Sequence, residues 1–513
     1  MATVGIDLGT TYCVVARLDD RGRPVTVPNR DGDILTPSAV YLTDDNHAVV
    51  GQPALDLALE EPDRVATLVK RQMGMPDYGR PVAGRSFRPE TLSAVILKKL
   101  VQDAARELGP IERAVITVPA YFDDTRRKAT QDAGKIAGLD VLDMIDEPSA
   151  AALAYTLQTA PAAELPQDGA RTILVYDLGG GTFDVTLVKL GKKRFQVLGI
   201  EGDVRLGGHD WDDRVVNHVA DQFQARFGAD PRADPQSVAM LRASAERAKR
   251  TLSKLDQASV TCAHAGQKLQ VPVTRAEFEA LTGDLLARTR LTTQEVLSQA
   301  KLTWEQVDKV LMVGGSTHMP ACGRMLAALT GREPDRSLAV SEVVARGAAV
   351  HAGILTARRA AAAGAAALLP LGDVVEISVN AHSLGVEVRA GEERVNDKLI
   401  RKNTQLPAAE TRVYRTARPG QTKVRVRVLQ GEAHQAAACI AVGECWIDGL
   451  PADLPRGSPV QVRCGVAANG LIEVTARDLT SGKEARAEIH RRGGLSDAEI
   501  AREAAWVAAL DVQ

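Results

Sequence analysis

The feature that most constrains the fold is an internal repeat of an apolar strand, a short polar turn and a second strand. The first copy is "VGIDLGTTYCVVARL", residues 4 to 18, and the second contains "VYDLGGGTFDV", residues 175 to 185. Both copies run from a strand into Asp-Leu-Gly and a hydroxyl residue, and then return to a strand. Such a repeat predicts two similar half-domains, each of which presents a hairpin to a shared cleft.

The turns of this repeat indicate what the cleft holds. Glycine lets backbone N–H groups approach an anion without an intervening side chain, and neighbouring carboxylates can hold a cation. We therefore predict two phosphate-binding hairpins, although a tight turn with solvated acids would explain either copy alone. The pattern G-x-x-x-x-G-K-[ST] does not occur in the sequence, which argues against a P-loop enzyme.

Composition narrows the class of protein further. The chain has 513 residues, and 63 Lys and Arg against 65 Asp and Glu leave a formal charge of -2, which does not suggest a nucleic-acid or membrane partner. The alanine-rich run at 358–374 is too short for a membrane span and begins with two arginines. The six cysteines lack C-x-x-C spacing and are expected to be small buried hydrophobes. We expect a cytoplasmic protein.

The pattern of apolar residues divides the chain into four parts. Residues 1–357 alternate strands with helices, as in α/β proteins, with a strand expected at 113–120, a helix at 123–138 and a strand at 308–315. Residues 358–378 read as an alanine-rich linker. Residues 379–492 show a period of two, clearest in "KVRVRVL", and are expected to be all-β. Ser496 and Glu499 form a capping box that opens one short helix within residues 493–513.

Several motifs, in this order, resemble the Hsp70 (DnaK-type) family of molecular chaperones. They are the two hairpins and the stretches "ITVPAYFDDTRRKAT", "IDEPSAAALAY", "ERAKRTLS", "VGGSTHMP", "VLQGE" and "NGLIEVTARDLTSGKE". The resemblance covers nearly the whole chain. It implies an actin-like, two-lobed ATPase domain, a β-sandwich that binds peptides, and a terminal helix that is the remnant of a lid. The implied function is ATP-controlled binding of unfolded or extended hydrophobic polypeptides.

The resemblance also implies which residues act on ATP and Mg²⁺. Phosphoryl transfer depends on positioning and on charge stabilisation, so it needs a cation, donors and an oriented water. Lys70 matches the lysine that reaches the γ-phosphate, although alone it would read as a solvated lysine. The other catalytic matches are Glu147 and Asp184 for the water, Thr182 beside the γ-phosphate, and Asp7 and Asp177 around the Mg²⁺ shell, largely through water. The residues expected to surround the phosphates are Gly9, Thr10, Thr11 and Tyr12 from one lobe and Gly179, Gly180 and Gly181 from the other.

A second set matches the adenosine end of the nucleotide. Its spacing of i, i+3, i+4 and i+7 puts the set on one helix face, which could also be a solvated, self-paired face. In the family this face clamps ribose and adenine, and Arg250 would stack on the base. The members of this set are Glu246, Lys249, Arg250 and Ser253 on the helix, with Gly314 and Gly315 on the opposite side of the purine. His318 stands where the family usually has arginine, so weaker nucleotide affinity is expected.

The peptide site transfers in part from the family. Val424 matches the central hydrophobic pocket, and the residues expected around it are Leu384, Val386, Tyr414 and Val426, with Ala417 on the arch over the peptide. These side chains could equally form an ordinary sandwich core. Arg389 stands where the arch often has an apolar residue, which leaves the preferred peptide open.

The chain departs from the family in regions that concern regulation. The segment after Lys70 is shortened, which reduces one outer subdomain. The outer loop on which exchange factors commonly act is also shortened, and together with His318 this makes an exchange factor expected to be dispensable. Glu376 replaces a leucine of the linker and is expected to disfavour docking into an apolar groove. At the J-domain docking surface the expected signs are reversed, by Asp143 in place of an arginine and by Lys189, Lys192, Lys193 and Arg194 on a strand that is usually acidic. We expect a non-standard J-domain partner or none.

Two other functions remain open at this point. A nucleotide-gated binding or scaffolding protein with specialised partners is compatible with the missing lid. A small-molecule kinase is compatible with the hairpins, because sugar kinases share the actin-like fold, but the β-domain and linker argue against it.

Overall fold

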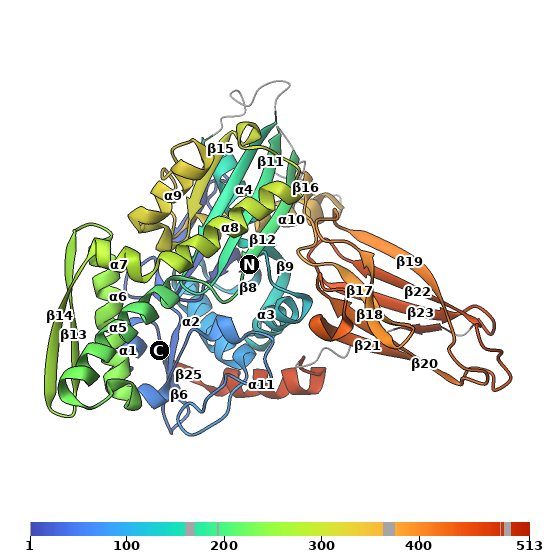
Figure 1. Cartoon of the computed structure of the whole chain (residues 1–513), viewed down its shortest axis with the longest axis horizontal. Coiled ribbons are helices and arrows are strands. Elements are labelled where there is room, and N and C mark those ends of the chain that lie inside the picture. The colour runs from blue at the N-terminus through green and yellow to red at the C-terminus, as the bar shows by residue number, and fades with distance from the viewer. Residues whose placement is uncertain (1, 160–169, 192–193, 363–374, 483, 487–493) are drawn as a thin grey trace.

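The computed structural model describes residues 2–159, 170–191, 194–362, 375–482, 484–486 and 494–513. Within them the protein is a mixture of helices and several separate sheets, so the predicted α/β class of the first part is confirmed (Figure 1). None of the helices in these described ranges combines the length and the apolar character that a membrane span requires.

The first sheet carries the first copy of the repeat. The strands, in spatial order, are β3 (Pro24–Val27), β2 (Tyr12–Leu18), β1 (Ala2–Leu8), β8 (Ile111–Val118) and β9 (Asp140–Asp146). β1 and β2 form an antiparallel hairpin, whereas β1, β8 and β9 run parallel. Helices α2 (Pro89–Leu108) and α3 (Asp124–Ile136) share a buried apolar cluster with these strands.

The second sheet carries the second copy. Its strands, in spatial order, are β15 (Lys309–Val313), β10 (Arg171–Leu178), β11 (Phe183–Gly191), β12 (Arg194–Asp203) and β16 (Val375–Ile377). β10, β11 and β12 are antiparallel, and β15 and β16 add in parallel at the two edges. Both copies of the repeat therefore become an antiparallel hairpin at the centre of a mixed sheet.

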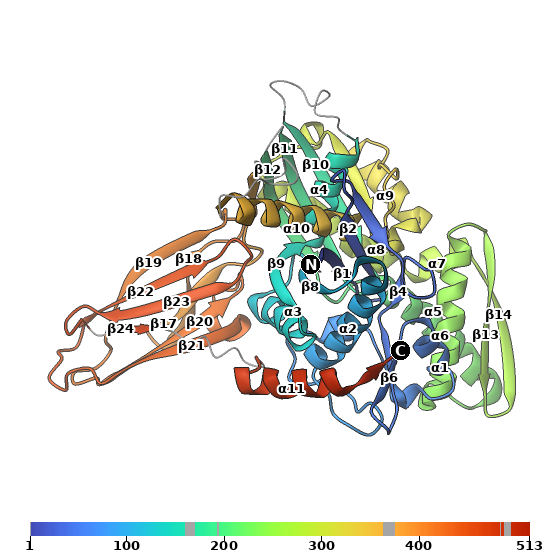
Figure 2. The same ribbon diagram turned by 180° about the vertical axis from the view of Figure 1, so that it is seen from behind.

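Helix α10 (Val343–Ala362) joins the two halves because it carries small residues. A Cβ atom on Gly5 of β1 would lie 2.1 Å from the backbone nitrogen of Ala349, and one on Gly347 would lie 1.8 Å from the carbonyl oxygen of Ala150 in α4 (Glu147–Thr159). Backbone approach this close requires glycine. Figure 2 shows α10 crossing beside β2 and β9.

Two smaller units lie outside these sheets. The unit on the first half consists of α1 (Gln52–Leu57) and the strands β5 (Ala39–Leu42), β6 (His47–Val50) and β7 (Val65–Thr67). The unit on the second half consists of α5 (Gly208–Phe227), α6 (Pro235–Leu252), α7 (Arg275–Leu281) and a hairpin of β13 (Gln257–His264) and β14 (Gln267–Thr274). Two further helices, α8 (Gly283–Gln299) and α9 (Pro320–Thr330), pack nearer the second sheet. β13 and β14 are joined by a two-residue turn, Ala265 and Gly266.

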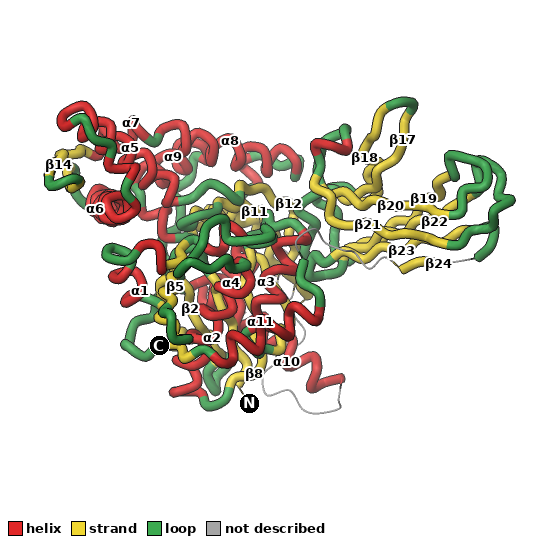
Figure 3. Tube along the Cα trace, turned by 90° about the horizontal axis from the view of Figure 1, so that it is seen from below, coloured by secondary structure: helices red, strands yellow, loops and turns green. Residues whose placement is uncertain are grey.

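Residues after the linker form two four-stranded antiparallel sheets that share one apolar core (Figure 3). One sheet is β18 (Glu393–Ile400), β17 (Leu384–Ala390), β20 (Lys423–Gln430) and β21 (Ile440–Asp448). The other is β19 (Ala408–Arg415), β22 (Pro459–Val466), β23 (Ile472–Asp478) and β24 (Glu484–Arg486). The period of two in β20 puts Val426 and Val428 in the core and Arg425 on the outer face, where it pairs with Glu444.

The predicted linker differs from expectation at both ends. Helix α10 continues through Ala362, so the first five residues of the stretch 358–378 are helical, because alanine and arginine favour a helix. At the other end β16 pairs in parallel with β12, with Glu376 opposite Phe195. This contact is made by the backbone of an edge strand, and the lower stability of docking expected from Glu376 stays a prediction.

The C-terminal segment also differs from the expected lid remnant. The predicted capping box of Ser496 and Glu499 opens α11 (Asp497–Ala509). However, the helix is not the last element, because β25 (Asp511–Val512) follows and pairs in parallel with β6. Figure 1 shows α11 beneath α2 and α3, on the side of the first half, and Val507 and Leu510 belong to that half's apolar cluster.

Candidate functional site

The two repeat hairpins place their turns face to face. A Cβ atom on Gly180 would lie 1.8 Å from Oγ1 of Thr11, and one on Gly181 would lie 2.4 Å from Cγ2 of Thr10. Gly9 is needed within its own turn, because a Cβ there would lie 2.0 Å from the carbonyl oxygen of Tyr12. The tertiary fold thus brings together the turns that the sequence repeat singles out, at backbone-to-side-chain distances that only glycine permits.

A buried ion pair lies beside these turns. Lys70, only 4% exposed, is in the short 3-10 helix η2 (Val69–Gln72) and pairs with Glu147 at the start of α4. Asp7, at the end of β1, accepts a hydrogen bond from the Thr117 hydroxyl at 2.8 Å. Lys70 is therefore not the solvated lysine of the alternative reading.

The second hairpin adds further buried polar groups. Asp177 and Asp184 are directly opposite each other in the β10–β11 register, and Asp184 accepts a hydrogen bond from the backbone N–H of Tyr121 at 2.9 Å. Thr182, 5% exposed, precedes β11, and its carbonyl accepts a hydrogen bond from the N–H of Gly179 at 3.0 Å. All six predicted catalytic residues lie on elements that meet at the two turns.

Burial and mutual repulsion disfavour the ionised carboxylates. Burial, followed by the charge of Glu147, raises the pKa of Asp7 to about 6. The same two causes, in the same order, hold the pKa of Asp177 and of Asp184 well above its usual range. Burial lowers the pKa of Lys70, but Glu147 and Asp7 outweigh it and the net shift is upward. The site holds more buried negative than positive charge.

This imbalance fits a cation held mainly through water. Among the described residues, no group of three or more His, Cys, Asp or Glu side chains is arranged as a direct metal cage. Mg²⁺ typically retains several waters and binds one or two carboxylates together with phosphate oxygens. Asp7 and Asp177 have the chemistry for such a site, and their raised pKa values indicate that a nearby positive charge would be favourable.

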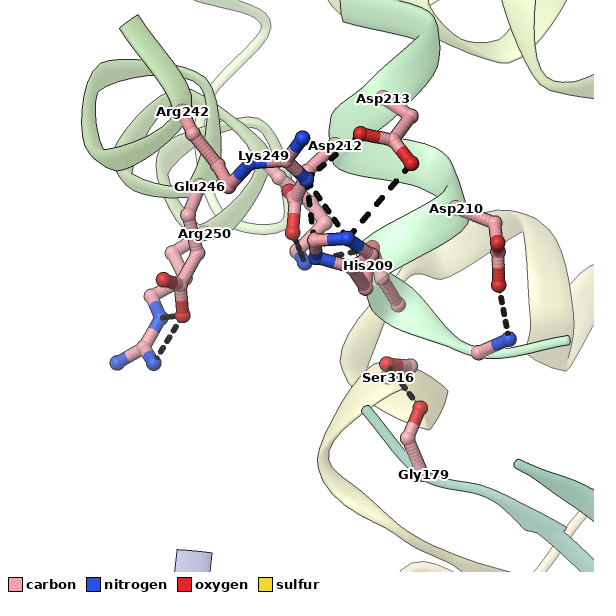
Figure 4. A network of polar contacts seen from close by, with 12 residues as sticks. Gly179, His209, Asp210, Asp212, Asp213, Arg242, Glu246, Lys249, Arg250 and Ser316 are labelled. Atoms are coloured by element: carbon pink, nitrogen blue, oxygen red, sulfur yellow. Dashed lines mark hydrogen bonds and ion pairs between the residues drawn. The ribbon is translucent and has the colours of Figure 1, made fainter. Parts of the chain in front are cut away.

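The predicted adenosine face lies on α6, with Ser253 as its C-cap residue. Arg250 pairs with Glu246 and also donates to the hydroxyl of Tyr12 at 2.7 Å, with its guanidinium 5.6 Å from the centre of that ring. Lys249 instead turns to Asp212 (Figure 4). The four residues thus share a helix face, but the Lys249 ammonium points toward α5, where its partners are Asp212 and the carbonyl of Gly208.

The glycine turn after β15 completes the surroundings of the second hairpin. Gly314 has φ of 82°, and a Cβ there would lie 2.5 Å from Oδ1 of Asp177. After Gly315, the Ser316 hydroxyl donates to the carbonyl of Gly179 at 2.8 Å. His318 is exposed and lines a cavity of about 260 Å³ together with Arg336 and Glu342.

Sequence reasoning missed a network that supports the second hairpin from α5 and α6 (Figure 4). The N–H groups of Gly208 and His209 donate to the carbonyls of Gly179 and Gly180 at 3.0 and 2.9 Å. Arg242, one turn before Glu246, contacts His209, and burial followed by Arg242 lowers the pKa of His209 to about 3. The signal available in the sequence was the Gly-Gly pair of "LGGHDWD" directly before a helical pattern.

The predicted peptide-site residues are spread along the two-sheet core, with Leu384 opposite Gln430 at one end of β20 and Val424 near the other end of that strand. Leu384, Val386 and Val426 are buried in it, and the less buried members of that core include Tyr414 and Val424. The Tyr414 hydroxyl donates to Asp397 at 2.8 Å. Ala417 is exposed in the turn between β19 and β20, and Arg389 is exposed at the end of β17. This geometry is common to an ordinary core and to the predicted pocket, so both readings remain.

The residues of the predicted J-domain surface differ in their contacts and in their exposure. The Asp143 carboxylate lies 3.0 Å from Nε2 of the buried His351. Lys189 and Arg194 are exposed on β11 and β12. Lys192 and Lys193 lie outside the described residues.

Comparison with known protein families identifies the family of this chain. The model for the family described as Hsp70 protein matches residues 3–80 and 76–509 of this chain. This match covers nearly the whole sequence, including the hairpins, the Lys70 segment and the two four-stranded sheets. Members of the family are ATP-dependent chaperones that hydrolyse ATP and bind unfolded polypeptides. The chain therefore belongs to the Hsp70 family.

Proposed function

We propose that this protein is a Mg²⁺-dependent ATPase whose nucleotide cycle controls the binding of unfolded or extended hydrophobic polypeptides. In this proposal residues 1–357 are an actin-like, two-lobed ATPase domain and residues 379–492 are a peptide-binding β-sandwich. The observation that carries it is the pair of glycine turns in contact at Gly180 and Thr11, beside the buried Lys70–Glu147 pair. Such turns offer backbone donors from both sides, which is what a polyphosphate requires.

The proposed roles follow from position and charge. Lys70 would hold the γ-phosphate and Thr182 would donate to it, while Glu147 and Asp184 orient the attacking water. Asp7 and Asp177 would hold the Mg²⁺ hydration shell, and the ion would neutralise phosphate charge when bound. The phosphates would contact Gly9, Thr10, Thr11 and Tyr12 on one side and Gly179, Gly180 and Gly181 on the other.

At the other end of ATP or ADP, Arg250 must leave the Tyr12 hydroxyl if it is to stack on adenine. Glu246, Lys249 and Ser253 would then contact the ribose, and Gly314 and Gly315 the far face of the purine. His318 would replace an arginine and weaken binding. The contact of Arg250 with Tyr12 supports this role, since it places the guanidinium beside the first hairpin, 5.6 Å from the centre of the Tyr12 ring.

The test is steady-state ATP turnover with Mg²⁺. Removing one preorganised charge from a phosphoryl-transfer site raises the barrier by about 2–4 kcal/mol, so Lys70→Ala should lower kcat by about 10²–10³-fold. Lys268→Ala, an exposed lysine of β14, is the matched control. Equal turnover in Lys70→Ala and the parent protein would reject the proposal.

The alternative functions are separated by two assays. Phosphorylation of a small-molecule acceptor would indicate a kinase. Refolding of a denatured client protein, compared with recovery of a narrow set of partners from lysate, separates a general chaperone from a scaffolding protein. We favour the chaperone because the apolar core of the two sheets reaches the half-buried Val424 and Tyr414.

We also propose an unusual set of co-chaperones. An exchange factor would be dispensable, because the β13–β14 turn is short and His318 replaces a cation at the purine. A conventional J-domain would be repelled, because Lys189 and Arg194 are exposed cations on β11 and β12, where the docking surface is usually acidic in the family. In addition, Asp143 replaces the expected arginine and contacts His351. Strong stimulation of single-turnover hydrolysis by a generic J-domain at low salt, with no further gain from Asp143→Arg, would contradict this.

We propose a cytoplasmic location, with no nucleic-acid or membrane partner. The near-neutral formal charge of -2 supports the absence of a polyanionic partner.

A further inference from the structure

Arg71, the neighbour of the proposed catalytic lysine, joins the two halves of the molecule. Its guanidinium contacts Asp210 of α5 at 3.1 and 3.3 Å, and both side chains are largely buried, with exposed fractions of 15% and 23%. Lys70 and Arg71 are consecutive in η2, yet their partners Glu147 and Asp210 lie on different elements. Two ion pairs therefore fix this short helix from two sides.

The path of the Arg71 side chain is informative. A Cβ on Gly181 would lie 3.1 Å from both Cγ and Cδ of Arg71, so the aliphatic stem lies directly over the glycine turn of the second hairpin. The contact reaches from the first half, across that turn, to the start of α5. It can form only while η2 is close to the second hairpin.

Asp210 is itself held in place. Its Oδ2 accepts a hydrogen bond from the N–H of Gly207 at 2.8 Å, as part of the capping box of α5 (Figure 4). The same helix start is bonded to the turn through the N–H groups of Gly208 and His209. Arg71 therefore pairs with a carboxylate that is rigidly attached to the turn proposed to bind phosphate.

We infer that Arg71 is a positioning residue, which holds Lys70 in register with the second hairpin through its ion pair with Asp210. This inference rests on the proposed ATPase function. Displacing a catalytic group by about 1 Å can cost about 10²-fold in rate. Arg71 directs its charge to Asp210 and not into the space between the turns, so its loss should lower kcat more than it changes KM for ATP.

The experiment is a double-mutant cycle on ATP turnover in the full chain. Arg71→Ala and Asp210→Asn should each lower kcat, Arg71→Ala by about 10- to 100-fold. The double variant should be no slower than Arg71→Ala, because both changes remove one interaction. Asn keeps an oxygen that can accept from Gly207, so Asp210→Asn separates the ion pair from the helix cap. Arg71→Lys should retain more activity than Arg71→Ala.

Arg324→Ala is the control, because it removes an arginine–carboxylate pair with Glu279 that lies within the second half, between α9 and α7. Its turnover should match that of the parent. Additive losses in the cycle, or a rise in KM without a fall in kcat, would overturn the inference in favour of direct phosphate contact by Arg71.

Two further results keep the inference apart from the proposed function. If Lys70→Ala loses activity while Arg71→Ala does not, only the role of Arg71 fails, whereas unchanged turnover in Lys70→Ala rejects the ATPase assignment and this inference with it.

Hydrogen exchange gives a readout without turnover. Amides of Val69–Gln72 should exchange faster in Asp210→Asn than in the parent or Arg324→Ala, and equal exchange would overturn the inference.

Discussion

At the scale of single residues, the buried carboxyl of Asp7 lowers the stability of the folded protein at neutral pH. The carboxyl is buried, and burial and Glu147 raise its pKa from 3.8 to about 6. Between these two values the native state holds a proton that the unfolded chain has released. The native state is therefore favoured below pH 3.8, and this contribution is lost as the pH rises through about 6.

We expect Asp7→Asn to stabilise the nucleotide-free protein at neutral pH while abolishing turnover. An upward pKa shift of about two units corresponds to about 3 kcal/mol, so the free energy of unfolding should rise by about 1–3 kcal/mol at pH 7. The gain should shrink as the pH falls from 6 to 4. Urea unfolding at several pH values measures it, with the exposed Asp448→Asn as control. A gain that is independent of pH would show that the carboxyl is not the cause.

Gly180 tests the contact between the turns. A methyl group in Gly180→Ala would overlap Oγ1 of Thr11, so the turns must separate and kcat should fall by about 10²-fold. Adding Thr11→Ala removes that oxygen and should restore part of the rate. Gly191→Ala, at the far end of the same hairpin, meets nothing closer than 3.7 Å and should be neutral. Parent-like turnover in Gly180→Ala would mean that the turns are not in contact.

At the scale of elements, α11 and β25 belong to the first half of the molecule. The Lys98 ammonium of α2 donates to the carbonyls of Val507, Ala508 and Leu510 at 2.8, 3.0 and 2.8 Å, a favourable position for a cation at a helix C-terminus. Trp506 packs on Phe87 with ring centroids 5.4 Å apart. Together with the pairing of β25 and β6, these contacts make the C-terminus a structural part of that half.

Val507 is the most buried residue of this segment, with 1% of its surface exposed. Val507→Ala should therefore destabilise the first half by about 2 kcal/mol through lost burial and a small cavity. Hydrogen exchange of β5, β6 and α2 should rise, while exchange in β17–β24 stays unchanged. Val413→Ala, 48% exposed in β19, is the control and should have little effect. Faster exchange in the two four-stranded sheets alone would contradict the assignment.

At the scale of the whole molecule, the two four-stranded sheets are attached to the two halves at several points. Lys402 pairs with Glu201, and the side-chain oxygen of Asn403 accepts from the N–H of Ile200 at 3.2 Å. The backbone N–H of Ile472 donates to Asp124 at 2.9 Å. With β16 on the second sheet and α11 on the first half, the chain on both sides of these sheets is held by the two halves.

Because α11 packs against the first half, it is not available to cover the peptide site proposed in the two four-stranded sheets. We expect peptide release to be fast in both the ATP and the ADP state. Deleting residues 494–513 should leave the release rate unchanged while lowering the thermal stability of the first half. Dissociation of a fluorescent peptide measures the rate. Slow release in the ADP state that becomes much faster after the deletion would show that the segment acts as a lid.

The sequence alone determined the local features of the site and of many elements. The repeat of Asp-Leu-Gly with hydroxyl residues predicted both hairpins, and the capping box predicted α11, because turns and helix ends depend on residues close together in the chain. The helix at 123–138 and the strands at 113–120 and 308–315 were also correct, apart from small differences at their ends.

Only the tertiary structure decided which of these elements meet. That Arg71 reaches Asp210, that Lys249 turns to Asp212, and that the C-terminus adds a strand to β6 all depend on contacts between residues far apart in sequence. The terminal helix shows the reason most clearly. Ile500, Ala504 and Val507 recur at helical spacing, which predicts one buried face, but this face could pack on the two four-stranded sheets or on the first half. Burial of apolar surface has no direction of its own, so the shape of the partner surface, assembled from α2, α3 and β6, decided the outcome.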